Sequence, residues 1–187
     1  MKVEFIEVKG TWREVADAAR TTIGMEKGEK DPSPAWKRKM LLSEHSPIRQ
    51  LSIKWKWKNL KYWVSVHFVR HKIGIEHFVS TQRTDRTGKD RDKVFQSAPV
   101  NHECIADAQA IINISRKRLC SQASTETRAA WKAFLKELKK KEPELVSVCV
   151  PECVYRGFCP EIKSCNYYIT PAFTKELERY RSSLGLE

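Results

Sequence analysis

Residues 48–57 read Ile-Arg-Gln-Leu-Ser-Ile-Lys-Trp-Lys-Trp, and this stretch decides the fold class. Its second half alternates apolar with polar side chains, with Ile53, Trp55 and Trp57 set against Ser52, Lys54 and Lys56. Because successive side chains of a strand point to opposite faces, a period of two predicts a β-strand with one buried face. The tryptophans are therefore expected in a core or at a subunit interface.

The same run offers a second interpretation. Lys-Trp-Lys-Trp-Lys, residues 54–58, resembles a platform for single-stranded nucleic acid, where aromatic rings stack on bases and lysines meet phosphates. A strand, however, sends its tryptophans and lysines to opposite faces. We favour the core or interface role, and keep a basic, non-catalytic nucleic-acid-binding protein as an alternative. That alternative predicts binding that weakens steeply with salt.

Hydrophobic spacing on both sides of this strand predicts further elements. They are an edge strand at 1–8, helices at 12–20, 35–42, 60–71, 103–122 and 125–141, and loops at 24–34 and 72–91. Thr11 and Asn59 are the expected N-caps of the first and third helices. Helices mixed with few strands, without regular alternation, predict an α+β fold with a small antiparallel sheet packed with helices.

Length and charge limit the class of protein. The 187 residues suit a single domain spanning 1–187, with a cysteine-rich tail from about residue 146. No apolar run is long enough to span a membrane, and the N-terminus lacks a secretory signal, so we expect a cytoplasmic protein without a membrane partner. The net charge of +12 predicts anionic ligands, either nucleotides or nucleic acid.

Six cysteines in a cytoplasmic chain do not predict a disulfide framework. Four of them cluster near the C-terminus, namely Cys149, Cys153, Cys159 and Cys165. Four thiolates could hold zinc tetrahedrally, but no Cys-x-x-Cys pair is present. We favour ordinary thiols here and predict no metal site.

The residues best suited to chemistry are Arg70-His71-Lys72, followed by Ser80-Thr81-Gln82-Arg83. Their order resembles the signature of the flavin-dependent thymidylate synthases, which is Arg-His-Arg, seven or eight residues, then a serine with an arginine two positions on. Seven intervening residues select Ser80 with Gln82, and eight select Thr81 with Arg83. We prefer the second register because a guanidinium can hold a phosphate through two parallel hydrogen bonds.

Three more segments match that family in the same order. Residues 18–22 resemble its early helix-end motif, Glu44-His45 resembles the pair before its central strand, and residues 107–118 resemble a helix that meets the flavin and the nucleotide. Three places depart from the pattern. The asparagine and glutamate usually found just before the motif serine are missing, and Phe78, Val79 and Ser80 stand there. Lys72 replaces the third residue of the motif, and His67 stands where the family commonly has a glutamine that contacts the base.

The resemblance implies a function for each matched residue. It implies FAD contacts for Thr22, Glu44, Arg70, His71, Lys72 and Asn113. It implies nucleotide contacts for His67, Ser80, Thr81, Gln82, Arg83 and Arg118. Taken singly, Arg70 and Lys72 also suit a solvated helix end, and Arg118 also suits a surface pair with Glu126.

The resemblance further implies a reaction. The protein would transfer a one-carbon unit from methylenetetrahydrofolate to C5 of dUMP and give dTMP, with FAD as cofactor and NADPH as hydride donor. Arg118 would be the catalytic residue, because a fixed guanidinium can stabilise the negative charge that develops on the uracil ring. A homotetramer with FAD at subunit interfaces is expected. The nearest alternative, motivated by His67, is a related hydroxymethylase acting on dUMP or dCMP.

Overall fold

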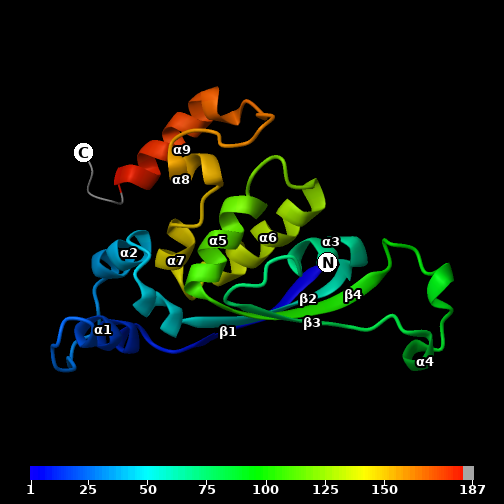
Figure 1. Ribbon diagram of the computed structural model, residues 1–187, viewed down its shortest axis with the longest axis horizontal. Helices are drawn as coiled ribbons and strands as arrows, with labels where there is room; N and C mark the ends of the chain where they lie inside the picture. Colours follow the sequence, from blue (N-terminus) through cyan, green and yellow to red (C-terminus); the bar gives the residue numbers. More distant parts are fainter. Residues whose placement is uncertain (183–187) are drawn as a thin grey trace.

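The computed structural model describes residues 1–182 and contains a four-stranded antiparallel sheet with strand order β1-β2-β4-β3. The strands are β1 (Lys2–Lys9), β2 (Ser52–Lys61), β3 (Ile75–Val79) and β4 (Pro99–Asp107). Helices pack on one side of this sheet (Figure 1). The predicted α+β fold with a small antiparallel sheet is therefore confirmed.

The central strand β2 has the two faces that its sequence predicts. Ile53, Trp55 and Trp57 are fully buried, whereas the lysines between them form ion pairs on the other face. Lys54 Nζ lies 3.0 Å from Glu103 Oε1, and a second lysine pairs with a glutamate of β1. The core role of the tryptophans is confirmed, and the base-stacking interpretation is wrong because their rings are inaccessible.

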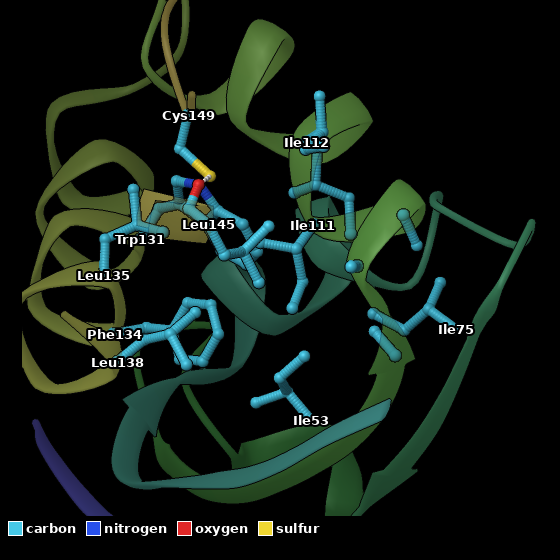
Figure 2. Close-up of a cluster of buried hydrophobic side chains, with 14 of the residues drawn as sticks. Ile53, Ile75, Ile111, Ile112, Trp131, Phe134, Leu135, Leu138, Leu145 and Cys149 are labelled. Carbon is cyan, nitrogen blue, oxygen red and sulfur yellow. Dashed lines mark hydrogen bonds between the residues drawn. The ribbon is translucent and has the colours of Figure 1, made fainter. Parts of the chain in front are cut away.

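Four helices cover the buried face of the sheet. They are α3 (Tyr62–Phe68), α5 (Ala108–Arg118), α6 (Thr125–Leu138) and α7 (Pro143–Ser147). Figure 2 shows Ile53 of the sheet beneath Ile111 of α5 and Phe134 of α6. Aromatic rings fill much of this layer, since Trp55 stacks on Phe134 with centroids 4.2 Å apart. Burying such large apolar side chains is the main stabilising contribution to the fold.

The remaining helices extend the molecule beyond the sheet. Helices α1 (Trp12–Thr21) and α2 (Pro34–Leu42) lie at one end, and the short α4 (Thr84–Thr87) lies at the opposite end (Figure 1). Thr11 caps α1 as predicted, in a capping box with Glu14. Helices α8 (Glu152–Arg156) and α9 (Pro171–Ser182) form the C-terminal part. The sequence-based expectations included no helix beyond residue 141, so α8 and α9 were missed.

The predicted helix at 60–71 starts too early, and Asn59 is not its N-cap. Strand β2 continues to Lys61, and α3 begins at Tyr62. Asn59 has a φ of 56° and lies where the register between β2 and its neighbour β4 shifts. Asparagine tolerates the left-handed region, so it suits a β-bulge as well as a helix cap. The sequence alone did not separate these two uses.

The predicted helix at 103–122 is partly wrong, because residues 103–107 belong to strand β4. Apolar residues in this segment fit both a period of two and a period near 3.6, and tertiary pairing with β2 and β3 selects the strand. Asp107 then caps α5, since its Oδ1 accepts a hydrogen bond of 2.7 Å from Ala110 N. The predicted helix at 125–141 is confirmed, with its end at Leu138.

The segment 72–91, predicted as one loop, contains strand β3 and helix α4. Strand β3 lies at the edge of the sheet and pairs only with β4 among the described strands. Its short length and its charged neighbours hide it in the sequence. Within residues 1–182 no helix is both long enough and apolar enough to cross a membrane.

Candidate functional site

The ends of α3 and α5 meet at a hydrogen-bonded cluster of three predicted site residues. Arg118 Nε donates to His71 Nε2 at 2.8 Å, and Arg118 Nη2 donates to the carbonyl oxygen of His67 at 2.6 Å. The Arg118 guanidinium is half-buried and held in a fixed plane by two acceptors. The alternative pair with Glu126 does not form, because that carboxylate bonds Lys61 instead.

The protonation of His71 follows from this contact. Because Arg118 donates to Nε2, that nitrogen carries a lone pair, so the neutral ring has its proton on Nδ1. Burial lowers the pKa of His71 to about 4, and the charges of Arg118 and His77 act in the same direction. Burial also lowers the pKa of His67, together with Arg118 and Arg70. His71 is therefore a neutral acceptor at physiological pH.

This cluster carries positive charge that the described chain does not balance. Burial lowers the pKa of Arg118, and the charge of Arg70 lowers it further. The charges acting on the pKa values of His67, His71 and Arg118 come from arginine and histidine, and no carboxylate of residues 1–182 is among them. Arg70 and Lys72 are exposed beside it. Such a cluster attracts an anion.

A second cluster forms on the outer face of α5. Gln109 Nε2 donates to Glu44 Oε2 at 2.5 Å, and Arg116 forms an ion pair with the other oxygen of that carboxylate. Asn113 Oδ1 accepts a hydrogen bond of 3.2 Å from Arg116 Nη1. The structure thus brings the predicted Glu44 and Asn113 together. The spacing of 109, 113 and 116 along one helix face could have indicated the two missed partners.

The residues of the two possible registers lie on an exposed segment after β3. Ser80 continues the sheet, since its N donates to Asn101 O at 2.9 Å and its Oγ accepts from Asn101 N at 3.0 Å. Thr81 Oγ1 accepts from Arg83 N at 3.1 Å. Both guanidinium arms of Arg83 bind Asp85, at 2.9 and 2.8 Å. Arg83 therefore already shows the bidentate geometry that a phosphate would need.

Gln82 and Thr22 complete the predicted set. Gln82 is half-buried between Thr81 and Arg83. Thr22 follows α1 and donates its hydroxyl to Ala19 O at 2.7 Å. It lines a cavity of about 760 Å³ between α1 and α2. Because α1 and α4 lie at opposite ends of the molecule (Figure 1), one chain does not bring Thr22 to the segment around Arg83.

Solved structures share this arrangement of elements. ThyX from Helicobacter pylori, a flavin-dependent thymidylate synthase complexed with FAD and dUMP, matches with a TM-score of 0.64 and 13% identity, over 80% of this chain and 100% of that one. The UMP/dUMP methylase PolB from Streptomyces cacaoi, bound with 5-Br dUMP, matches with a TM-score of 0.64 and 13% identity, over 84% and 95%. The chain has the ThyX fold. No protein-family model and no curated protein matches its sequence.

The fold expected from the resemblance is thus confirmed, and the ThyX fold here contains a histidine network that the sequence did not reveal. His77 Nε2 donates to His71 O at 2.8 Å, so its Nδ1 accepts, at 2.9 Å, from His102 Nε2. Cys104 Sγ lies 3.4 Å from the same Nδ1. Burial lowers the pKa of His102 to about 3. The network fixes the backbone of His71 from within the sheet.

Proposed function

We propose that this chain is a flavin-dependent enzyme that modifies the uracil ring of dUMP or a related pyrimidine nucleotide. The observation that carries the proposal is the unbalanced cationic cluster around Arg118, placed on a ThyX fold. The ThyX and PolB neighbours were solved with FAD, dUMP or a brominated dUMP. The burial of Trp55 and Trp57 counts against the alternative of a nucleic-acid-binding protein.

FAD fits the residues present. Its diphosphate is anionic, and Arg70 and Lys72 are exposed cations at the end of α3. Asn113 offers an exposed amide on α5, next to the Glu44 carboxylate through their shared partner Arg116. We infer that these residues, with His71 and Thr22, hold the flavin. When bound, FAD supplies the hydride that reduces the transferred one-carbon unit.

Arg118 would stabilise the charge that develops on the nucleotide. Attack by C5 of uracil builds negative charge on the ring oxygens, and a guanidinium already oriented in a half-buried site stabilises this charge without reorganising. Two of its N–H groups are committed to His71 and the His67 carbonyl, which leaves its other donors for the base. Neutral His71 orients Arg118 and does not neutralise it.

The substrate phosphate would bind at the segment after β3. Arg83 holds Asp85 in an exposed ion pair, and exposed pairs contribute little free energy. A phosphate carrying two negative charges can therefore displace the carboxylate at small cost. Thr81 offers a hydroxyl group next to Arg83. In the other register Ser80 and Gln82 would bind the phosphate. Comparing KM for the nucleotide in Arg83 and Gln82 variants distinguishes the two registers.

Methylenetetrahydrofolate is the proposed carbon donor and NADPH the proposed hydride source, giving dTMP. His67 stands where the resembled family commonly has a glutamine, and its ring bonds Thr127 Oγ1 at 2.9 Å. That difference supports a second candidate, hydroxymethylation of dUMP or dCMP. The products differ in mass, because a methyl group replaces hydrogen in one and a hydroxymethyl group in the other.

The proposed site draws residues from both ends of the molecule. Thr22 and Arg83 belong to opposite ends of the molecule, so flavin and phosphate ligands from both ends can meet only between subunits (Figure 1). We propose a homotetramer with sites at its interfaces. Light scattering on the purified protein, with and without FAD, measures the assembly. A monomer in the presence of FAD would contradict it.

The test of the function is flavin content followed by turnover. The purified protein is expected to carry FAD, or to bind it when added, and to convert dUMP or dCMP with methylenetetrahydrofolate and NADPH. Mass spectrometry of the product then identifies a methyl or a hydroxymethyl increment. Absence of bound flavin, together with no binding of added FAD, would overturn the proposal.

A further inference from the structure

Four cysteines from separate segments line one cavity at the C-terminal end of the molecule. The cavity has a volume of about 230 Å³ and lies between the end of α5, helix α8 and the chain leading to α9. Its cysteines are Cys120, Cys153, Cys159 and Cys165. Cys120 follows α5, Cys153 lies in α8, and the other two lie in the connection between α8 and α9.

This set differs from the four tail cysteines that the sequence suggests. Cys149 Sγ donates to Leu145 O at 3.3 Å and points into the main core (Figure 2). Cys120, which is distant in sequence, takes its place. Three tail cysteines line the cavity, namely Cys153, Cys159 and Cys165. The fold adds Cys120 to them as the fourth.

The four thiols act on one another. Burial raises the pKa of Cys120 most strongly, and repulsion from Glu161, Cys165 and Cys159 raises it further. Burial likewise raises the pKa of Cys153 to about 11, with contributions from Cys120 and Cys159. The thiols are therefore close enough to interact electrostatically, as their positions around one cavity require.

The rest of the lining suits a thiolate–metal site. Glu152 is committed to Arg156 at 2.6 Å, and Glu176 accepts a hydrogen bond of 2.5 Å from Tyr167. Glu161 also lines the cavity, but a soft metal prefers the four thiols to a carboxylate. Arg128 and Lys132 of α6 also line the cavity. Their charge would offset the excess negative charge of a divalent ion bound by four thiolates.

The backbone around the cavity has little other support. Residues 157–166 form neither strand nor helix. One side-chain bond ties this stretch to the connection between α5 and α6, from Gln122 Nε2 to Lys163 O at 2.7 Å. Gly157 and Asn166 turn the chain with φ values of 81° and 62°. Irregular segments of this kind are commonly held in proteins by a structural metal.

We propose that Cys120, Cys153, Cys159 and Cys165 bind one structural Zn²⁺ ion. On binding, the four S–H bonds break, four Zn–S bonds of about 2.3 Å form, and four protons pass to water. In the described structure no three cysteine sulfurs lie within 4.8 Å of one another. Binding of the ion therefore requires the four sulfurs to move closer together. The irregular connection carrying Cys159 and Cys165 can make this movement.

The ion would fix the end of the helix that carries Arg118. Cys120 is two residues beyond Arg118 in the sequence. A metal bond at Cys120 would therefore prevent fraying of the last turn of α5, where the candidate site is built. The zinc proposal stands on the cysteines alone and does not depend on the flavin chemistry.

Metal analysis of the full-length protein tests the proposal. We expect about one zinc per chain after expression with zinc and purification under reducing conditions. A mercurial reagent that blocks thiols should release this zinc from the unmodified sequence. Cobalt added to metal-free protein should give the intense visible absorption of tetrahedral thiolate coordination.

Single substitutions locate the site. Cys120→Ser and Cys165→Ser should each lose most of the bound zinc, while Cys149→Ser retains it as the matched control. Circular dichroism of each variant shows whether the helices remain folded. Protein that takes up no zinc under reducing conditions, iron in place of zinc, or a mass lower by the two hydrogens of a disulfide between cavity cysteines would each overturn the proposal.

Discussion

Arg118 and His71 are joined by a hydrogen bond of 2.8 Å, although 47 positions separate them in the sequence. The bond decides the state of both groups. The Nε2 lone pair of His71, whose ring burial keeps neutral, accepts the bond, and the bond holds the guanidinium in a fixed orientation. The charged group of the candidate site is thus Arg118, and the histidine serves to position it.

Arg118→Lys should lower kcat/KM by about 100-fold or more, since an ammonium cannot contact His71, the His67 carbonyl and the base in one plane. Steady-state kinetics with dUMP measures the effect. Arg38→Lys, on the exposed surface of α2, is the matched control and should leave the kinetics unchanged. A lysine variant with the activity of the unmodified protein would remove Arg118 from the proposed role.

Arg83→Ala should raise KM for the nucleotide about 10-fold with a smaller change in kcat, because a phosphate contact is made equally in the ground state and the transition state. Gln82→Ala is the matched neighbour and should change KM by less than about 3-fold. The reverse ranking would select the register in which Ser80 and Gln82 bind the phosphate.

The unfolding free energy should fall as the pH drops below about 6.5. Burial holds the pKa of His71 at about 4 and that of His102 at about 3, against an ordinary value of 6.5. Between these values the unfolded chain takes up protons that the folded chain refuses, so acid favours unfolding. Each histidine contributes a slope of about 1.4 kcal/mol per pH unit.

Urea unfolding at several pH values between neutral and mildly acidic measures this slope. His102→Gln keeps a hydrogen-bond donor for His77. It should reduce the slope of unfolding free energy against pH by about 1.4 kcal/mol per pH unit, the contribution of one proton. His45→Gln, at an exposed position, is the control. An unchanged slope in the His102 variant would show that this residue does not titrate below its ordinary range.

Trp57→Ala should lower the unfolding free energy by about 3–5 kcal/mol, because it leaves a cavity among stacked aromatic rings. Trp57 stacks on Phe68 with centroids 4.5 Å apart and is fully buried. Its neighbour Lys56 faces the other side, and Lys56→Ala should cost less than about 1 kcal/mol. Denaturant unfolding compares the two. Similar losses would contradict the assigned faces of β2.

Glu44→Gln should lower the unfolding free energy by about 2 kcal/mol, since it leaves the charge of Arg116 without its partner in a mostly buried pair. Adding Arg116→Met should recover part of the loss, because no unpaired charge then remains. Asp85→Asn breaks the exposed pair with Arg83 and should cost under about 1 kcal/mol. Additive losses in the double variant would show that Glu44 and Arg116 are not coupled.

Much of the fold follows from local pattern. The alternation in β2, the capping of α1 by Thr11 and the apolar stripe of α6 are properties of neighbouring residues, and the sequence predicted all three. The errors occur where two local preferences compete. Asn59 suits both a cap and a bulge, and residues 103–107 fit both periods, so pairing with distant strands made the choice.

The sequence by itself determined the class of fold, the buried face of β2 and the order of motifs that resembles the flavin-dependent thymidylate synthases. Only the tertiary structure decided which residues meet. It joined Arg118 to His71, committed Glu44 to Arg116, and replaced Cys149 with Cys120 among the clustered cysteines. The physical reason is range, because caps and periodicity act within a few residues, whereas hydrogen bonds, ion pairs and metal sites need atoms that only packing brings together.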